Sequence, residues 1–100
     1  MKSMVERIAE ERATHEARGY TAEHDINHTD GSLATAALCY LETAQIQLAN
    51  GMTTVPDCYH HKKWPWKREE FKPRDPITNL VKAGALLAAA GDRAILISGN

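Results

Sequence analysis

Two histidines and two carboxylates lie close together between residues 24 and 30. His24 is followed directly by Asp25, His28 comes four residues after His24, and Asp30 follows closely. On a helical turn His24 and His28 would share a face, a spacing that presents two nitrogen ligands to zinc or another divalent cation. One hypothesis for this cluster is therefore a metal-dependent hydrolase of a phosphoester or nucleotide, with a metal-bound water as nucleophile.

The same cluster has two other interpretations. Polar side chains before a helix often cap it and hydrogen-bond to one another, which would make residues 19–30 a rigid structural network. They can also bind a ligand without any metal. A catalytic zinc site needs a third protein ligand, and the spacing of His15, Cys58 and His60 does not identify one. The sequence assigns no catalytic residue and no cofactor, and an enzyme is the least favoured class because no catalytic constellation is complete.

Positive charge and aromatic rings are concentrated between residues 59 and 74. From His61 to Arg74 six basic residues stand against two acidic ones, a local net charge of +4 that leaves −5 for the remainder of the chain. Four of the six aromatic residues fall in or beside this stretch. Cationic side chains can meet phosphates while rings stack on bases, as in proteins that bind single-stranded nucleic acid. The candidate ligand- or partner-binding residues are His24, Asp25, His28, Lys62, Lys63, Trp64, Trp66, Lys67, Arg68, Lys72 and Lys82.

The alternative for the aromatic residues is structural. A chain of 100 residues with two tryptophans needs at least one of them for packing, and lysines beside them solvate the loop. Trp64, Trp66 and Phe71 would then be the side chains that fix an irregular connection in place.

Local signals predict where the helices begin and end. Ser3 and Glu6 form a capping-box pattern that starts a helix over about residues 3–18. A second helix lies between the capping residues Thr29, Asp30 and Ser32 and the pair Asn50-Gly51. Asp75-Pro76 starts a third helix over about residues 76–90, which Gly91 ends.

Apolar periodicity predicts which side of each helix is buried. The stripe of the second helix consists of Leu33, Ala36, Ala37, Tyr40, Leu41, Ala44 and Leu48, and that of the third of Leu80, Val81, Gly84, Leu87 and Ala88. Pro56, Pro65 and Pro73 exclude a continuous helix between residues 51 and 74, apart from a short helical turn near residues 67–71. Residues 94–97 stay open between a final turn, a strand and a tail docked on a neighbour.

These elements predict a single small all-α domain over residues 1–100, with three helices and a long irregular connection, rich in Trp and Pro, between the second and third. No apolar run reaches the roughly 18 residues of a membrane span, and the first residues lack the apolar stretch of a secretory signal. Cys39 and Cys58 are expected to be free thiols, Cys39 buried and inert. We therefore expect a cytoplasmic protein without membrane partners.

Three runs of residues are notable in combination: A-R-G-Y-T-A-E-H-D-I-N-H-T-D-G-S-L-A-T-A-A-L-C-Y (17–40), W-P-W-K-R-E-E-F-K-P-R-D-P (64–76) and N-L-V-K-A-G-A-L-L-A-A (79–89). Together they resemble a small domain of phage and prophage proteins, which occurs alone or near the end of early-region accessory proteins of lambdoid phages. The resemblance covers about residues 6–90. Its polar signature falls on Glu23, His24, Asp25, His28, Gly31, Trp64, Pro65, Trp66, Lys72, Pro73, Asp75, Asn79 and Lys82.

The resemblance implies a setting and no mechanism, because that family has no established activity. It implies a phage-encoded accessory protein that acts in the bacterial cytoplasm. The chain departs from the family pattern at Ile26-Asn27, where an acidic residue is more usual, at Phe71, where a second tryptophan is common, and over residues 91–100. The divergent ending weakens any function placed on the last helix.

Three functions follow, in order of preference. The first is a binding module that takes a nucleotide or nucleic acid, or blocks a host protein as an anti-defence or anti-CRISPR-like inhibitor. The second is a homo-oligomeric interaction module that uses the apolar residues 94–97 and the small residues Gly84, Ala85, Ala88, Ala89 and Ala90. The third is the hydrolase based on His24, His28 and an aspartate.

Overall fold

The computed structural model describes residues 1–17, 31–57 and 59–99 of the chain. The described residues contain three α-helices, α1 (Met4–Ala17), α3 (Ser32–Ala49) and α4 (Pro76–Ser98), a short 3-10 helix η1 (Arg68–Glu70), and no strand. The expected all-α fold with three helices is confirmed. The helical turn expected near residues 67–71 is present as η1. The histidine and aspartate cluster of residues 24–30 and Cys58 lie outside the described residues.

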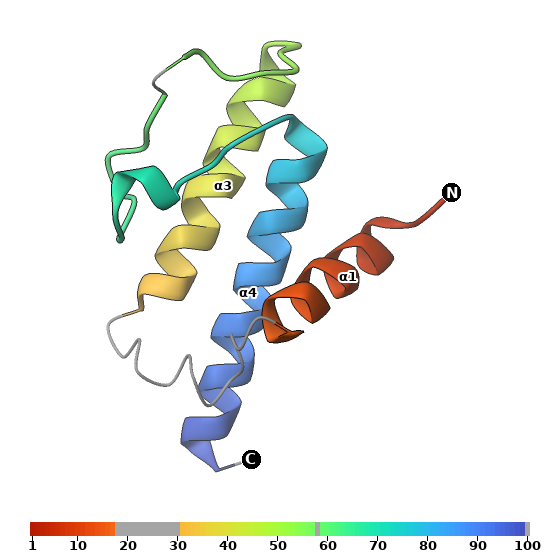
Figure 1. Ribbon diagram of the computed structural model, residues 1–100, viewed down its shortest axis with the longest axis vertical. Helices are drawn as coiled ribbons and strands as arrows, with labels where there is room; N and C mark the ends of the chain where they lie inside the picture. The colour runs from red at the N-terminus through yellow and green to blue at the C-terminus, as the bar shows by residue number, and fades with distance from the viewer. Residues whose placement is uncertain (18–30, 58, 100) are drawn as a thin grey trace.

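α4 is the central element of the arrangement. α3 and α4 run antiparallel side by side, and α1 packs against α4 (Figure 1). Residues 50–75, which we call the connecting segment, leave the end of α3, run beside α3 and return to the start of α4 (Figure 1). The antiparallel pair thus carries the connecting segment on one side and α1 on another.

Local capping chemistry explains the starts of α1 and α4. The Ser3 hydroxyl accepts a hydrogen bond from the Glu6 N–H (3.1 Å), and the Glu6 carboxylate accepts one from the Ser3 N–H (3.2 Å). The Asp75 carboxylate accepts hydrogen bonds from the N–H of Thr78 (3.1 Å) and from its hydroxyl (2.6 Å), with Pro76 in the first turn. Both predicted caps are confirmed.

The residue at the cap position of α3 is Gly31. It has a φ of 78° and carries no side chain that could cap the helix. Ser32 is already the first residue of the helix and is buried. The prediction that Ser32 caps α3 was therefore wrong, while Thr29 and Asp30 lie outside the described residues.

α4 extends well past the predicted end at Gly91. It continues through residues 94–97 to Ser98, and Gly99, with a φ of 78°, ends it. A single glycine costs a helix only about 1 kcal/mol relative to alanine, too little to stop it when helix-forming residues follow. The part of α4 beyond Gly91 also contacts α1, because the Asp92 carboxylate lies 3.7 Å from the guanidinium of the buried Arg12.

The predicted apolar stripes are only partly buried. On α3 Leu33, the three alanines of the stripe and Tyr40 are buried, but Leu41 and Leu48 are exposed. Cys39, Thr43 and Gln47 are buried as well, although they lie outside the predicted stripe. On α4 Leu87 is exposed. The connecting segment covers a different side of α3 from the one that the leucines mark, and a periodicity rule cannot foresee this long-range contact.

The contact between α1 and α4 depends on a glycine. A Cβ atom at Gly84 would lie 2.5 Å from Cδ1 of Ile8 and 2.8 Å from its Cγ1. The Ile8 side chain therefore packs directly on the α4 backbone, which no larger residue at position 84 permits without a shift of α1.

Candidate functional site

A cluster of aromatic rings fixes the connecting segment on α3. Tyr40 and Phe71 are buried, with ring centroids 5.0 Å apart. Trp64 lies against both rings, at 5.6 Å from Tyr40 and 4.8 Å from Phe71, and Tyr59 lies 6.1 Å from Phe71. The expectation that large rings hold this connection in place is therefore confirmed for Phe71 and Trp64.

Two buried amides hold the ends of the connecting segment. Gln47 on α3 donates hydrogen bonds from Nε2 to the carbonyl oxygens of Thr54 (3.1 Å) and Arg74 (2.8 Å). Asn79 on α4 donates from Nδ2 to Oε1 of Gln47 (2.8 Å) and to the Arg74 carbonyl (3.0 Å), and its Oδ1 accepts from the Arg74 N–H (2.7 Å). Both side chains are almost fully buried, so each bond replaces one that water would otherwise supply.

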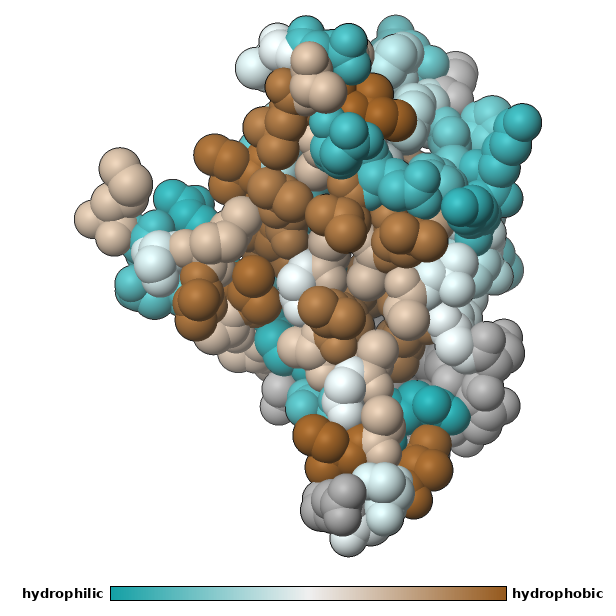
Figure 2. All heavy atoms as spheres, turned by 180° about the vertical axis from the view of Figure 1, so that it is seen from behind, coloured by the Kyte–Doolittle hydropathy of each residue, from teal (hydrophilic) through white to brown (hydrophobic). Residues whose placement is uncertain are grey.

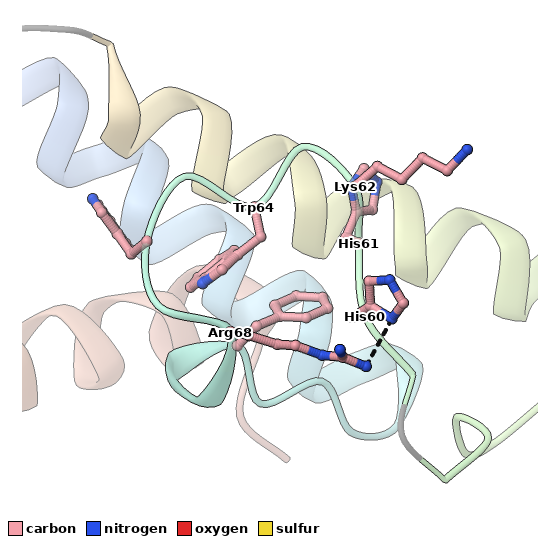
Figure 3. A pocket seen from close by; sticks show the side chains of 7 residues that line it. His60, His61, Lys62, Trp64 and Arg68 are labelled. Carbon is pink, nitrogen blue, oxygen red and sulfur yellow. Dashed lines mark hydrogen bonds between the residues drawn. The ribbon is translucent and has the colours of Figure 1, made fainter.

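An open hollow of about 300 Å³ lies between the two arms of the connecting segment (Figure 3). Its walls combine cationic and aromatic side chains from residues 60–71. They are His60, His61, Lys62, Trp64, Trp66, Arg68 and Phe71. The two indoles meet edge to face with centroids 5.3 Å apart, and both remain partly exposed.

Hydrogen bonds and ion pairs order the polar rim of the hollow. The Arg68 guanidinium reaches across to Nδ1 of His60 (3.1 Å), whereas Lys62 extends outward from the loop (Figure 3). Nε2 of His61 and Nζ of Lys63 lie 3.6 and 3.7 Å from Oε1 of Glu42 on α3. The Glu42 carboxylate thus faces one imidazole and one ammonium group, and the rim, with Lys62, Lys63 and Arg68 against Glu42, keeps an excess of positive charge.

Trp64 is held by a polar bond as well as by packing. Its indole N–H donates to the Lys67 carbonyl (2.9 Å), which closes the turn that leads into η1. The Lys67 side chain is exposed and does not line the hollow.

Lys72 and Lys82 lie beside one another, outside the walls of the hollow. The Lys82 ammonium donates to the Lys72 carbonyl (3.0 Å) and lies 5.4 Å from the centre of the Tyr40 ring. The Tyr40 hydroxyl accepts a hydrogen bond from the Lys72 N–H (3.0 Å). Burial lowers the pKa of Lys82 and raises that of Tyr40, because it disfavours the charged form of each. Lys82 therefore fastens the connecting segment to α4.

The structure brings together four of the predicted site residues, Lys62, Trp64, Trp66 and Arg68. Lys63, Lys67, Lys72 and Lys82 belong to the same segment or contact it, but do not line the hollow. His24, Asp25, His28 and Asp30 lie outside the described residues.

Sequence reasoning missed the histidines of the hollow and the amide pair beneath it. Neither His60 nor His61 is among the predicted binding residues, although their place within the basic and aromatic stretch was a usable signal. Gln47 carries no such signal, because a glutamine in a helix is typical of an exposed position.

The described part of the chain provides neither a metal centre nor a reactive thiol. No group of three or more His, Cys, Asp or Glu residues within it is placed to hold a metal ion. Cys39 is buried, and desolvation raises the pKa of its thiol, so the thiolate is disfavoured. Over the same residues, no helix has the length and apolar character needed to cross a bilayer.

Comparison with known proteins finds no matching family model, no matching curated protein and no matching solved structure.

Proposed function

We propose that the chain is a small binding module that holds a nucleotide unit, either free or within a single strand of nucleic acid, at the hollow of the connecting segment. The observation that carries this proposal is the meeting of two indoles with Arg68 around one hollow, with Lys62 at its rim. Cations there meet phosphate, while a partly exposed ring accepts a base by stacking. Lys63, Lys67 and Lys72, all exposed nearby, add to the attraction of an anion.

The biological setting of the proposal comes from the resemblance to the phage domain. The W-P-W and K-P-x-D motifs that carry part of this resemblance belong to the connecting segment. We propose a phage-encoded accessory protein in the cytoplasm of the bacterial host, which counters a host defence or another host process by occupying its nucleotide or nucleic acid. Direct blocking of a host protein is the alternative that the experiment below separates.

Tryptophan fluorescence is a direct test, because the chain has two tryptophans and both line the hollow. A nucleoside triphosphate and a single-stranded oligonucleotide of about 10 residues, within the site sizes of single-strand binders, should be titrated separately. We expect saturable quenching by at least one of them, with an affinity that falls steeply as salt is raised. An unchanged emission with both ligands would overturn the proposal and leave a host protein as the partner.

A matched pair of charge substitutions locates the binding. Lys62→Met removes a cation from the hollow, and Lys2→Met removes one from the start of α1, where Lys2 pairs with Glu10 at 2.9 Å. Lys62→Met should weaken binding by a few-fold to tenfold and lower the salt dependence by about one phosphate contact, while Lys2→Met leaves both unchanged. Equal losses in the two variants would indicate nonspecific attraction to a charged surface.

A further inference from the structure

The two long helices carry very few charges. The 18 residues of α3 and the 23 residues of α4 include only Glu42, Lys82, Asp92 and Arg93 as charged residues, in a chain where every fourth residue is charged. A surface helix normally has charged residues along the face away from the core, and a helix that lacks them on all sides is typical of a buried position.

Three of these four charges are directed toward other parts of the same chain. Glu42 lies 3.6 and 3.7 Å from His61 and Lys63, and Lys82 donates to the Lys72 carbonyl, so both face the connecting segment. Asp92 faces α1 through its 3.7 Å ion pair with Arg12. The few charges of α3 and α4 thus gather on the sides that the chain itself covers.

Large apolar side chains occupy the remaining side of the helix pair. Leu41 and Leu48, which are seven residues apart and share one face of α3, are 48% and 60% exposed, and Leu87 on α4 is 64% exposed. Seen from behind, apolar side chains gather over the middle of the molecule (Figure 2). We call the surface marked by Leu41, Leu48 and Leu87 the back face.

We propose that the back face is the interface of a homodimer, in which α3 and α4 of two copies pack into a four-helix bundle. A surface without charge is complementary to itself, because a two-fold axis brings leucine onto leucine and buries no unpaired ion. The pairing leaves the connecting segments of both copies uncovered. It does not depend on the proposed function, because the hollow lies on a different side of the helix pair.

Sedimentation equilibrium tests the proposal on the full chain. At about 100 µM, where a dimer with a micromolar Kd is almost complete, the mass should be twice 11.1 kDa. Leu87→Glu and Leu41→Glu place a carboxylate in the interface and should raise the Kd at least about 100-fold, so that about half or less of the chains remain dimeric at about 100 µM, with the circular dichroism of the wild type. Since both leucines are exposed within one copy, neither change is expected to unfold it.

Val5→Glu is the matched control, because Val5 is an apolar residue of α1 with 77% exposure that lies outside the back face. This variant should dimerise like the wild type. A wild-type chain that remains monomeric at about 100 µM, or a Leu87→Glu variant that remains as dimeric as the Val5→Glu control, would overturn the proposal.

Discussion

Two sides of the α3/α4 pair, one covered by the connecting segment and one exposed, are built on different principles. On the side of the connecting segment, Gln47, Asn79 and Tyr40 reach backbone groups with directed hydrogen bonds, and aromatic rings fill the space between them. On the back face, Leu41 and Leu87 offer apolar area without any directional bond. Directed hydrogen bonds fix one geometry, as a site for a small ligand requires. An apolar surface can associate with many partners, and its specificity depends on how well the two shapes fit.

The largest loss of stability is expected when the amide pair that holds the connecting segment is removed. Asn79→Ala deletes the donor to Gln47 and Arg74 and the acceptor for the Arg74 N–H, leaving buried polar groups without partners. We expect a loss of about 2–4 kcal/mol in the free energy of unfolding, measured by urea denaturation. Gln45→Ala, at an exposed position of α3, is the control and should change it by less than about 0.5 kcal/mol. Similar losses in both variants would contradict the role of the amide pair.

The next largest loss of stability is expected at the contact between α1 and α4, which depends on a close steric fit. Gly84→Ala places a Cβ where Ile8 lies and should destabilise the protein by about 1–3 kcal/mol, measured by thermal and urea unfolding. Combining it with Ile8→Ala removes the clashing atoms, so the double variant should be more stable than the sum of the two single losses predicts. If the losses of the two single variants simply add, the Ile8 side chain does not pack tightly against Gly84.

The cap of α4 should have a smaller effect that depends on pH. Asp75→Ala should cost about 1 kcal/mol near neutral pH, because the Thr78 N–H loses its acceptor. The hydrogen bonds from the Thr78 hydroxyl and N–H lower the pKa of Asp75 below its ordinary 3.8, so its stabilisation is present above 3.8 and disappears as the pH falls through the lowered value. Urea unfolding at a series of pH values should show the variant and the wild type converging in acid, and a constant difference would contradict this account.

The smallest effect is expected from Lys82→Met. This variant distinguishes residues that hold the connecting segment in place from residues that bind the ligand. The variant loses the bond to the Lys72 carbonyl but no longer desolvates a charge, so the free energy of unfolding should change by less than about 1 kcal/mol. Ligand affinity should be unchanged, in contrast to Lys62→Met. A loss of affinity equal to that of Lys62→Met would return Lys82 to the candidate site.

The elements that sequence reasoning predicted well depend on contacts within a few residues. The starts of α1 and α4 follow from side chains three positions apart, and the hollow was foreseeable in part because its charges and rings are neighbours in the chain. Features that depend on distant segments were not foreseeable. The burial of Gln47, the exposure of Leu41 and the course of α4 beyond Gly91 are decided by what packs against them, and helical periodicity carries no information on that.

The bonds from Gln47 to the carbonyls of Thr54 and Arg74 bring two points twenty residues apart to one side chain. The exposed residues between them can therefore vary in number and type at modest entropic cost, as long as the two ends and the core residue Phe71 are retained. Replacing these exposed residues while leaving the helices untouched offers evolution, or an engineer, a route to new recognition on an unchanged scaffold.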